Sequence, residues 1–198
     1  MVEDLDYLSR SIDDYTGSPI VRAALRLLPL VFVRPVELRH ARWSDIDGQL
    51  ARWTIPAAIM KMRSPHMVPL SRLAIAVIDG LRPLTSDGPY LFPSLRTIRR
   101  PISENTLNGA LRRLGYSGDE MTSHGLPSMA STRLNEMGRW NPDVIERPLR
   151  HHSATWPHVL LTELACSARP EAIRMPTMGY IGQPAGVARQ EPGKTVVI

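Results

Sequence analysis

The sequence predicts a fold of the α+β class that is mainly helical and carries a small antiparallel sheet. Apolar residues recur at helical spacing in several segments, first in residues 20–32. Residues 49–56 and 67–70 are short enough, and residues 49–56 alternate enough, to form a pair of strands. With 198 residues, 43% of them hydrophobic, the chain can bury a substantial core.

The first half of the chain is divided by recognisable helix and turn signals. Residues 20–32 form an apolar helix, and Pro35 stands at the first turn of a second helix over 36–43, where a missing N–H is tolerated. Turn residues at 44–48 end that helix. Ser71 caps an apolar helix that runs to about Leu81, and a loop follows.

The second half follows the same pattern. Residues 90–94 are expected to form a short buried strand that ends at a proline. Residues 103–106 open a helix that continues through Leu114. A further helix begins near His124 and ends near Gly138, and another is expected over 141–147.

The charge balance favours a polyanionic partner. The formal net charge is +5, and nucleic acid is the simplest such partner, although a generally basic surface gives the same count. No apolar run is long enough to cross a membrane, and residues 1–18 show no signal-peptide pattern. Cys166 is the only cysteine, which excludes an intrachain disulfide and favours a cytoplasmic location. No metal-ligand spacing is present, so we expect no metal.

Three basic residues stand where a phosphate could bind. His124 lies at the start of a helix, and unpaired N–H groups and the helix dipole favour anions there. Arg34 precedes the helix of Pro35, one turn before Glu37, which could fix the direction of the guanidinium. Lys61 lies in the turn between the two predicted strands. Each of these features alone is also compatible with an ordinary cap or solvated loop.

Taken together, the motifs resemble the catalytic domain of prophage-type integrases of the tyrosine recombinase family. The resemblance covers roughly residues 5–151. It rests on VRPVELRHARWSDID at 33–47, MKMRSPHMVPLS at 60–71, LFPS at 91–94, SENTLN at 103–108 and MTSHGLPSMASTRLNE at 121–136. The family cleaves DNA by attack of a tyrosine on a phosphodiester, without a metal, nucleotide or other small-molecule cofactor.

The resemblance implies catalytic roles for four residues. Arg34 matches the first arginine, which clamps the non-bridging phosphate oxygens, and Lys61 matches the hairpin lysine that protonates the leaving 5′-oxygen. His124 and His151 match the two histidines around the phosphate. Preorganised cations and donors of this kind stabilise the charge of the transition state more than that of the ground state.

Further polar and basic residues are expected to contact DNA, because such side chains near helix starts and loop tips bind phosphates and base edges. They are Arg39, Arg63, His66, Arg99, Arg100, Ser103, Asn105 and Arg112. The resemblance implies double-stranded DNA and other integrase protomers as partners. It places the protein at the nucleoid of a bacterial cytoplasm.

The sequence departs from the family at two catalytic positions. The second arginine should stand three residues after His124, where this chain has Pro127. At the family's spacing after His151, the nucleophilic tyrosine would fall at Leu160 or Leu161, and Tyr180 is the only tyrosine beyond that histidine. A proline has no charge or donor, and a leucine cannot attack a phosphate.

The composition predicts three segments. Residues 1–19 read as a short lead-in in place of the family's core-binding domain, 20–151 as the integrase-like catalytic domain, and 152–198 as a divergent tail rich in proline and glycine. The loss of both resemblance and helix pattern after about residue 151 suggests a disrupted reading frame. Reading the coding DNA in the other two frames would test this, since one should restore an alanine-rich helix with a tyrosine.

Three functions are compatible with the sequence. The first is an enzyme of DNA integration or excision, which the motifs up to His151 support. The second is a non-catalytic DNA-binding remnant of a prophage integrase, which Pro127 and the missing tyrosine support. The third is a helical protein unrelated to DNA. The sequence favours a DNA-binding integrase homologue whose cleavage chemistry is impaired.

Overall fold

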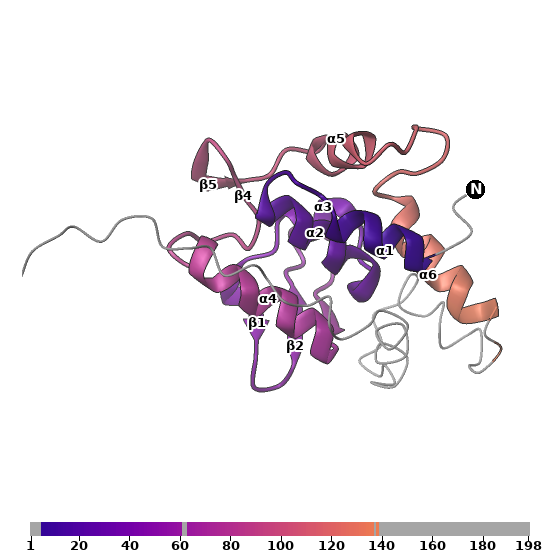
Figure 1. Cartoon of the computed structure of the whole chain (residues 1–198). Coiled ribbons are helices and arrows are strands. Elements are labelled where there is room, and N and C mark those ends of the chain that lie inside the picture. The colour runs from indigo at the N-terminus through magenta and orange to yellow at the C-terminus, as the bar shows by residue number, and fades with distance from the viewer. Residues whose placement is uncertain (1–4, 61–62, 137, 139–198) are drawn as a thin grey trace, which may run out of the picture.

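A computed structural model describes residues 5–60, 63–136 and 138 of the chain (Figure 1). This part is mainly helical and carries two small antiparallel sheets, so the predicted fold class is confirmed. Its α-helices are α1 (Leu5–Asp13), α2 (Pro19–Val31), α3 (Pro35–Arg39), α4 (Arg72–Thr85), α5 (Thr106–Arg113) and α6 (Gly125–Glu136). Its strands are β1 (Ile46–Asp47), β2 (Arg52–Ile55), β3 (His66–Pro69), β4 (Pro93–Ser94) and β5 (Thr97–Pro101).

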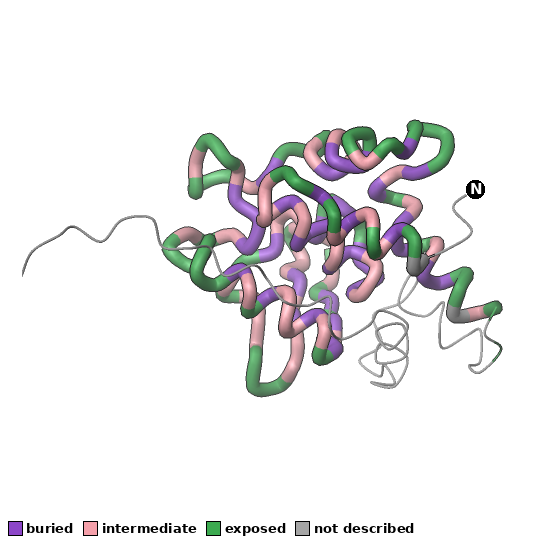
Figure 2. The backbone as a smooth tube through the Cα atoms, in the orientation of Figure 1, coloured by how far each residue is buried: buried purple, intermediate pink, exposed green. Residues whose placement is uncertain are grey.

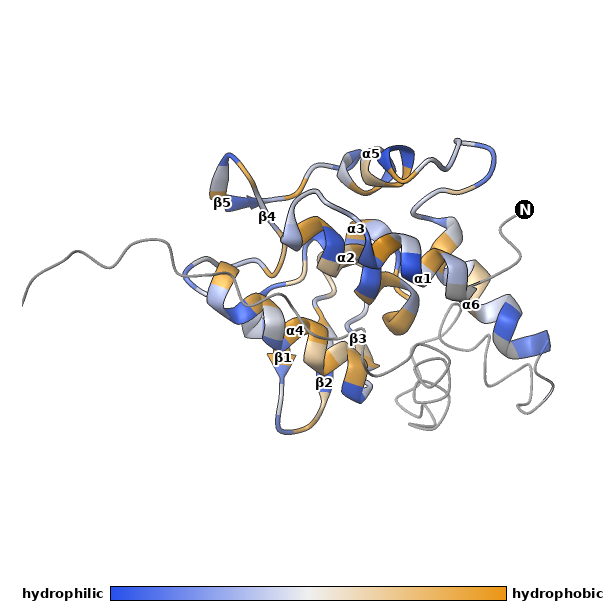
Figure 3. Cartoon of the chain, viewed as in Figure 1, coloured by the Kyte–Doolittle hydropathy of each residue, from blue (hydrophilic) through white to orange (hydrophobic). Residues whose placement is uncertain are grey.

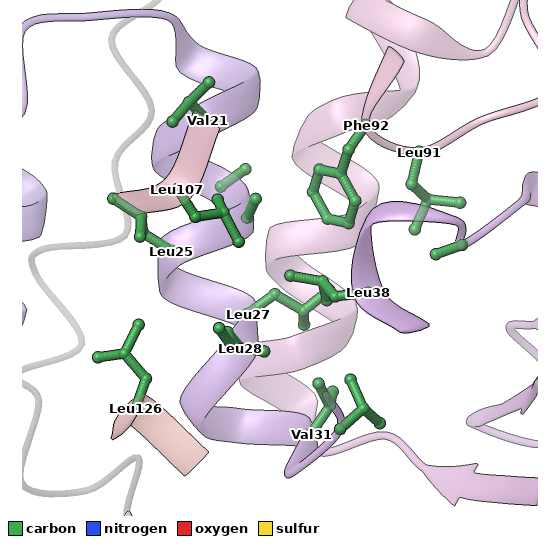
Figure 4. Close-up of a cluster of buried hydrophobic side chains, with 14 of the residues drawn as sticks. Val21, Leu25, Leu27, Leu28, Val31, Leu38, Leu91, Phe92, Leu107 and Leu126 are labelled. Atoms are coloured by element: carbon green, nitrogen blue, oxygen red, sulfur yellow. The ribbon is translucent and has the colours of Figure 1, made fainter. Parts of the chain in front are cut away.

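Helix α2 is the centre of the core. It packs against all five of the other α-helices in the described part of the chain. Its buried residues lie on more than one face, as a helix surrounded by others requires, and they are Val21, Ala23, Ala24, Leu25, Leu27, Leu28 and Val31. Figure 4 shows this cluster, with Leu107 of α5 and Leu126 of α6 against α2, and Figure 2 shows burial concentrated around it.

Helix α2 leads directly to the first candidate site residue. The helix ends at Val31, and Phe32 at its C-cap has a φ of 54°, a left-handed conformation that is rare for a bulky residue. The Phe32 side chain is buried, which helps to hold the backbone in this turn. The chain then passes through Val33 and Arg34 into α3, whose first residue is Pro35, as the sequence predicted.

The first sheet has three strands in the order β1-β2-β3, all antiparallel. The hairpin of β2 and β3 confirms the predicted strand pair, with Trp53 and Ile55 buried on alternate positions of β2. The prediction of a simple turn over 44–48 was wrong, because Ile46 pairs with Trp53 and a 3-10 helix, Trp43–Asp45, precedes it. A strand of two residues is too short to show an alternation of apolar and polar residues in the sequence.

The second sheet is a two-stranded hairpin of β4 and β5. The predicted strand over 90–94 is reduced to Pro93–Ser94, after the fully buried Leu91 and Phe92. Residues 97–101, expected only as a cluster of arginines, form the partner strand. Residues 98–100 are all exposed, so the burial alternation that identifies a strand is absent here.

Two helix boundaries differ from the prediction. Helix α3 ends at Arg39 rather than near 43, with His40 as its C-cap. Helix α4 extends to Thr85 despite the internal Pro83, beyond the predicted end near Leu81. Two side chains donate hydrogen bonds to carbonyl groups near the C-terminal end of α4. Thr85 Oγ1 donates to the Leu81 carbonyl (3.3 Å), and Trp43 Nε1 donates to the Thr85 carbonyl (3.1 Å).

The described part of the predicted lead-in, residues 5–19, is packed into the core. Helix α1 lies against α2, and Leu8, Ile12 and Tyr15 are buried there. The Tyr15 hydroxyl accepts a hydrogen bond from Arg113 of α5 (3.2 Å). The expected helix over 141–147 and the predicted tail lie outside the described residues.

Candidate phosphate and nucleic-acid site

Arg34 is the N-cap residue of α3, in extended conformation. Its side chain is 51% exposed, whereas that of Glu37 is only 6% exposed. Glu37 Oε2 accepts the backbone N–H of Arg34 at 2.8 Å, which stabilises the start of the helix. The carboxylate therefore fixes the backbone of Arg34 more firmly than its guanidinium.

The ion pair between the two side chains is loose. Arg34 Nη1 lies 3.9 Å from Glu37 Oε1, and an exposed arginine at that distance gains little from the pair. Glu37 was predicted to direct the guanidinium, but its close contact is with the Arg34 backbone and its contact with the guanidinium is weak. A guanidinium carries five donors in a planar fork, and the exposed one of Arg34 can turn toward an anion without breaking a strong internal contact.

His124 immediately precedes α6, as the sequence predicted. The start of α6 is fixed by Thr122, whose carbonyl (2.9 Å) and Oγ1 (3.2 Å) both accept the Gly125 N–H. Leu126 is fully buried and anchors the first turn against α2 (Figure 4). The exposed His124 therefore stands at the N-terminus of a twelve-residue helix, whose dipole favours an anion there.

Pro127 lies in the first turn of α6 and is buried. Proline is tolerated in a first turn because the N–H it lacks would have had no helical partner. Because proline has no side-chain or backbone hydrogen-bond donor, position 127 cannot donate a hydrogen bond to a phosphate.

The structure places two of the four predicted catalytic residues. Arg34 follows the C-terminal end of α2, and His124 precedes the helix whose first turn packs on α2, so one helix supports both. Lys61 and His151 lie outside the described residues.

Three of the predicted DNA contacts lie on α3 or the hairpin of β2 and β3. Arg39 is half-buried, and its Nη1 donates to the Ile102 carbonyl at 3.1 Å, so it joins α3 to the residue that follows β5. Arg63 is exposed in the loop before β3. His66 was expected in that loop, but it is the first residue of β3 and is buried with 7% exposure. Its ring does not project toward solvent.

Four other predicted contacts lie close together in the chain and are exposed: Arg99, Arg100, Ser103 and Asn105. They lie on β5 and on the segment that leads into α5, with Asn105 as the N-cap of α5. Figure 1 shows that the β4–β5 hairpin and α5 lie along the same edge of the molecule, and Figure 3 shows hydrophilic residues on both. This edge offers a basic, polar surface.

Arg112 has a different environment from the one predicted. The residue is exposed, as predicted, but its guanidinium was expected to contact DNA, whereas its Nη2 donates to the Met121 carbonyl at 2.7 Å and its Nη1 to that of Tyr116. The guanidinium is therefore bound to the loop between α5 and α6.

Asn108 was not singled out from the sequence. Its Oδ1 accepts the Ser123 N–H at 2.8 Å, next to His124. The available signal was a polar residue inside a helix, one turn before Arg112 and next to the buried Leu107.

The described residues contain no group of three or more His, Cys, Asp or Glu side chains arranged to hold a metal ion. No helix within that same part of the chain is long and apolar enough to span a membrane.

The sequence model of the phage integrase family matches residues 6–156 of this chain. The chain belongs to the phage integrase family. Among relatives in this family, the integrase of Enterobacteria phage P4 is 39% identical over 159 residues, which cover 74% of this chain and 36% of that protein. The chain spans less than half the length of the curated relatives it matches.

Solved structures of phage integrase relatives and other recombinases share the fold. XerA recombinase has a TM-score of 0.61 at 20% identity, covering 86% of this chain and 60% of that one. A lambda integrase dimer bound to a COC′ core site has a TM-score of 0.56 at 23% identity, covering 77% of this chain and 58% of that one. The fold is that of a tyrosine recombinase catalytic domain.

Proposed function

We propose that this chain binds the phosphate backbone of double-stranded DNA as the catalytic domain of a phage-type integrase, and that its strand-cleavage chemistry is impaired. The observation that carries the proposal is the half-exposed guanidinium of Arg34 at the start of α3. The buried Glu37 accepts a hydrogen bond from the Arg34 backbone N–H and leaves the Arg34 guanidinium able to bind an anion.

His124 supports the same site from a second helix start. An imidazole beside the N-terminus of α6 can donate to a phosphate oxygen, and α2 supports this helix and Arg34 alike. Lys61 and His151 complete the proposed set by their match to the family motifs. Charge on the phosphate oxygens grows in the transition state, so preorganised donors of this kind favour that state.

The proposed contact surface extends to the exposed residues of β5 and the start of α5. Arg99, Arg100, Ser103 and Asn105 offer charge and hydrogen-bond donors along one edge, and Arg63 offers a further cation. Buried His66 and the engaged Arg112 are left out of this surface. The net charge of +5 is consistent with a polyanionic partner.

Partners and location follow from the same proposal. The lambda integrase of similar fold is a dimer bound to a core site. We infer that this chain likewise meets DNA together with other integrase protomers. Its place of action would be the bacterial cytoplasm, at the nucleoid.

DNA binding is tested with a fluorescently labelled duplex and anisotropy at increasing NaCl. Phosphate contacts release counterions, so affinity should be micromolar or weaker and should fall steeply between roughly 50 and 200 mM salt. A flat response over this range would contradict the proposal. When Arg34→Ala is compared with the wild type, Arg133→Ala is the control for the loss of one positive charge. It removes an exposed cation that is paired with Glu136.

The impairment rests on Pro127 and on the residues after His151. Pro127 replaces the second phosphate-binding arginine, and removing one such donor typically lowers the rate by about a hundred- to a thousand-fold. Leu160 and Leu161 occupy the positions expected for the nucleophile. Without a nucleophile, electrostatic stabilisation has no covalent step to accelerate.

The second candidate function, an active recombinase, is favoured by Tyr180, the one tyrosine after His151. Incubation with a nicked suicide duplex that the phage P4 integrase cleaves separates the two functions. We expect a covalent protein–DNA band with the P4 integrase and none with this chain. An adduct mapped by mass spectrometry to Tyr180 would establish cleavage and overturn the proposed impairment.

A further inference from the structure

Two side chains on consecutive turns of α5 bind the backbone of the loop that leads to His124. Asn108 and Arg112 are four residues apart and therefore lie on the same face of the helix. Their partners lie in the loop 116–123, between α5 and α6. Contacts from one rigid helix to both ends of a loop restrict where the loop can place its last residue.

Asn108 fixes the end of this loop that is nearer to α6. Its Oδ1 accepts the Ser123 N–H at 2.8 Å, and Ser123 is only 1% exposed. A buried N–H that loses its acceptor costs free energy because water cannot replace the bond. The interaction therefore selects one position for the peptide immediately before His124.

Arg112 fixes the remainder of the loop. Its guanidinium spans the Met121 carbonyl (2.7 Å) and that of Tyr116, both in buried residues. Within the loop, the Ser117 N–H donates to the exposed Glu120 carboxylate at 2.7 Å, and this hydrogen bond lowers the pKa of Glu120. The loop is thus held by hydrogen bonds from Arg112 of α5 and by the hydrogen bond between Ser117 and Glu120 within the loop.

The position of His124 depends on these backbone contacts. Within residues 5–60, 63–136 and 138, the His124 imidazole makes no hydrogen bond to another residue. In that part of the chain, therefore, no hydrogen bond to the ring sets its orientation. The residues on either side of His124 are fixed, Ser123 by Asn108 and Gly125 by Thr122.

We propose that Asn108 and Arg112 are positioning residues that set the place of His124 at the start of α6. The role of His124 toward phosphate rests on the function proposed above, whereas the positioning itself can be measured without DNA. On this account Arg112 acts through the loop, and its charge is not a principal DNA contact.

The first experiment uses NMR on the intact chain. Asn108→Leu keeps the side-chain shape and removes the acceptor, so exchange of the Ser123 amide should become about five- to ten-fold faster, the effect of losing one ordinary hydrogen bond. The His124 imidazole signals should shift with it. Asn108→Asp keeps an acceptor and should restore slow exchange, and Asn135→Leu, on the last turn of α6, is the matched control.

Arg112→Met keeps the proposal testable if Asn108→Leu does not fold. It removes the guanidinium at an exposed position and leaves the Asn108 bond in place. The Met121 and His124 signals should shift. Unchanged His124 signals in this variant, or unchanged Ser123 exchange in a folded Asn108→Leu, would overturn the positioning role.

A double-mutant cycle with His124→Ala separates positioning from general destabilisation. Asn108→Leu should weaken duplex binding about three- to ten-fold when His124 is present, and much less in the His124→Ala background. Equal weakening in both backgrounds would contradict positioning through His124. If NMR shows His124 displaced while DNA binding is unchanged in every variant, the positioning stands and the proposed phosphate role of His124 fails.

Discussion

Replacing Glu37 with alanine is expected to lower the free energy of unfolding by about 1–2 kcal/mol. The carboxylate is almost fully buried and accepts the Arg34 N–H at 2.8 Å at the start of α3. Truncation leaves this N–H without its acceptor and removes the group that fixes the Arg34 backbone. The same variant should therefore also bind duplex DNA more weakly.

The magnitude follows from the contacts of Glu37. A hydrogen bond from a backbone N–H to an ionised acceptor contributes about 1.5–3 kcal/mol, and helix N-terminal caps contribute about 0.5–2 kcal/mol. The 3.9 Å ion pair adds almost nothing, because the Arg34 side chain is half exposed. Removing the carboxylate also removes the cost of keeping it out of water, which offsets part of the loss.

Urea unfolding followed by far-UV circular dichroism measures this difference. Glu37→Gln keeps an oxygen that can accept the Arg34 N–H and should lose less than about 1 kcal/mol. An alanine variant as stable as the wild type would refute the reasoning. A glutamine variant as unstable as the alanine variant would show that the charge, rather than the hydrogen bond, matters.

Three further substitutions test other parts of the fold and site. Ser71→Ala removes the acceptor of the Ala74 N–H (3.1 Å) at the start of α4 and should cost about 1 kcal/mol in urea unfolding. Ala51→Gly relieves a φ of 47° before β2 and should stabilise by about 0.5–1 kcal/mol; a lower urea midpoint would count against strain at this turn. Pro127→Arg should tighten duplex binding about three- to ten-fold without producing a covalent adduct, measured by anisotropy against Pro127→Ala; equal affinity in the two variants would exclude a restored clamp.

The parts of the fold predicted correctly are those with local signals. The periodic apolar residues of α2, the cap at Ser71 and the proline at the start of α3 are readable within one turn of helix. Strand β5 was missed because its neighbouring exposed arginines show no alternation, and its pairing with β4 becomes visible only in three dimensions.

The positions of two candidate site residues relative to the helices were predictable to the same extent. Arg34 and His124 precede helices, and the motifs marked both positions. The burial of His66 and the bonds from Arg112 to the loop depend on contacts between separate elements, so composition and spacing could not reveal them. Asn108 was missed for the same reason, since its partner lies fifteen residues further along the chain.

The salt dependence of DNA binding by Arg34→Ala tests the central claim most directly. Each phosphate contact contributes about 0.9 to the slope of log affinity against log salt concentration. If the exposed guanidinium of Arg34 binds a backbone phosphate, this variant should have a slope less steep than the wild type by about one. The Arg133→Ala control should keep the wild-type slope. An Arg34→Ala slope equal to that of the control would contradict the claim that Arg34 binds DNA phosphate.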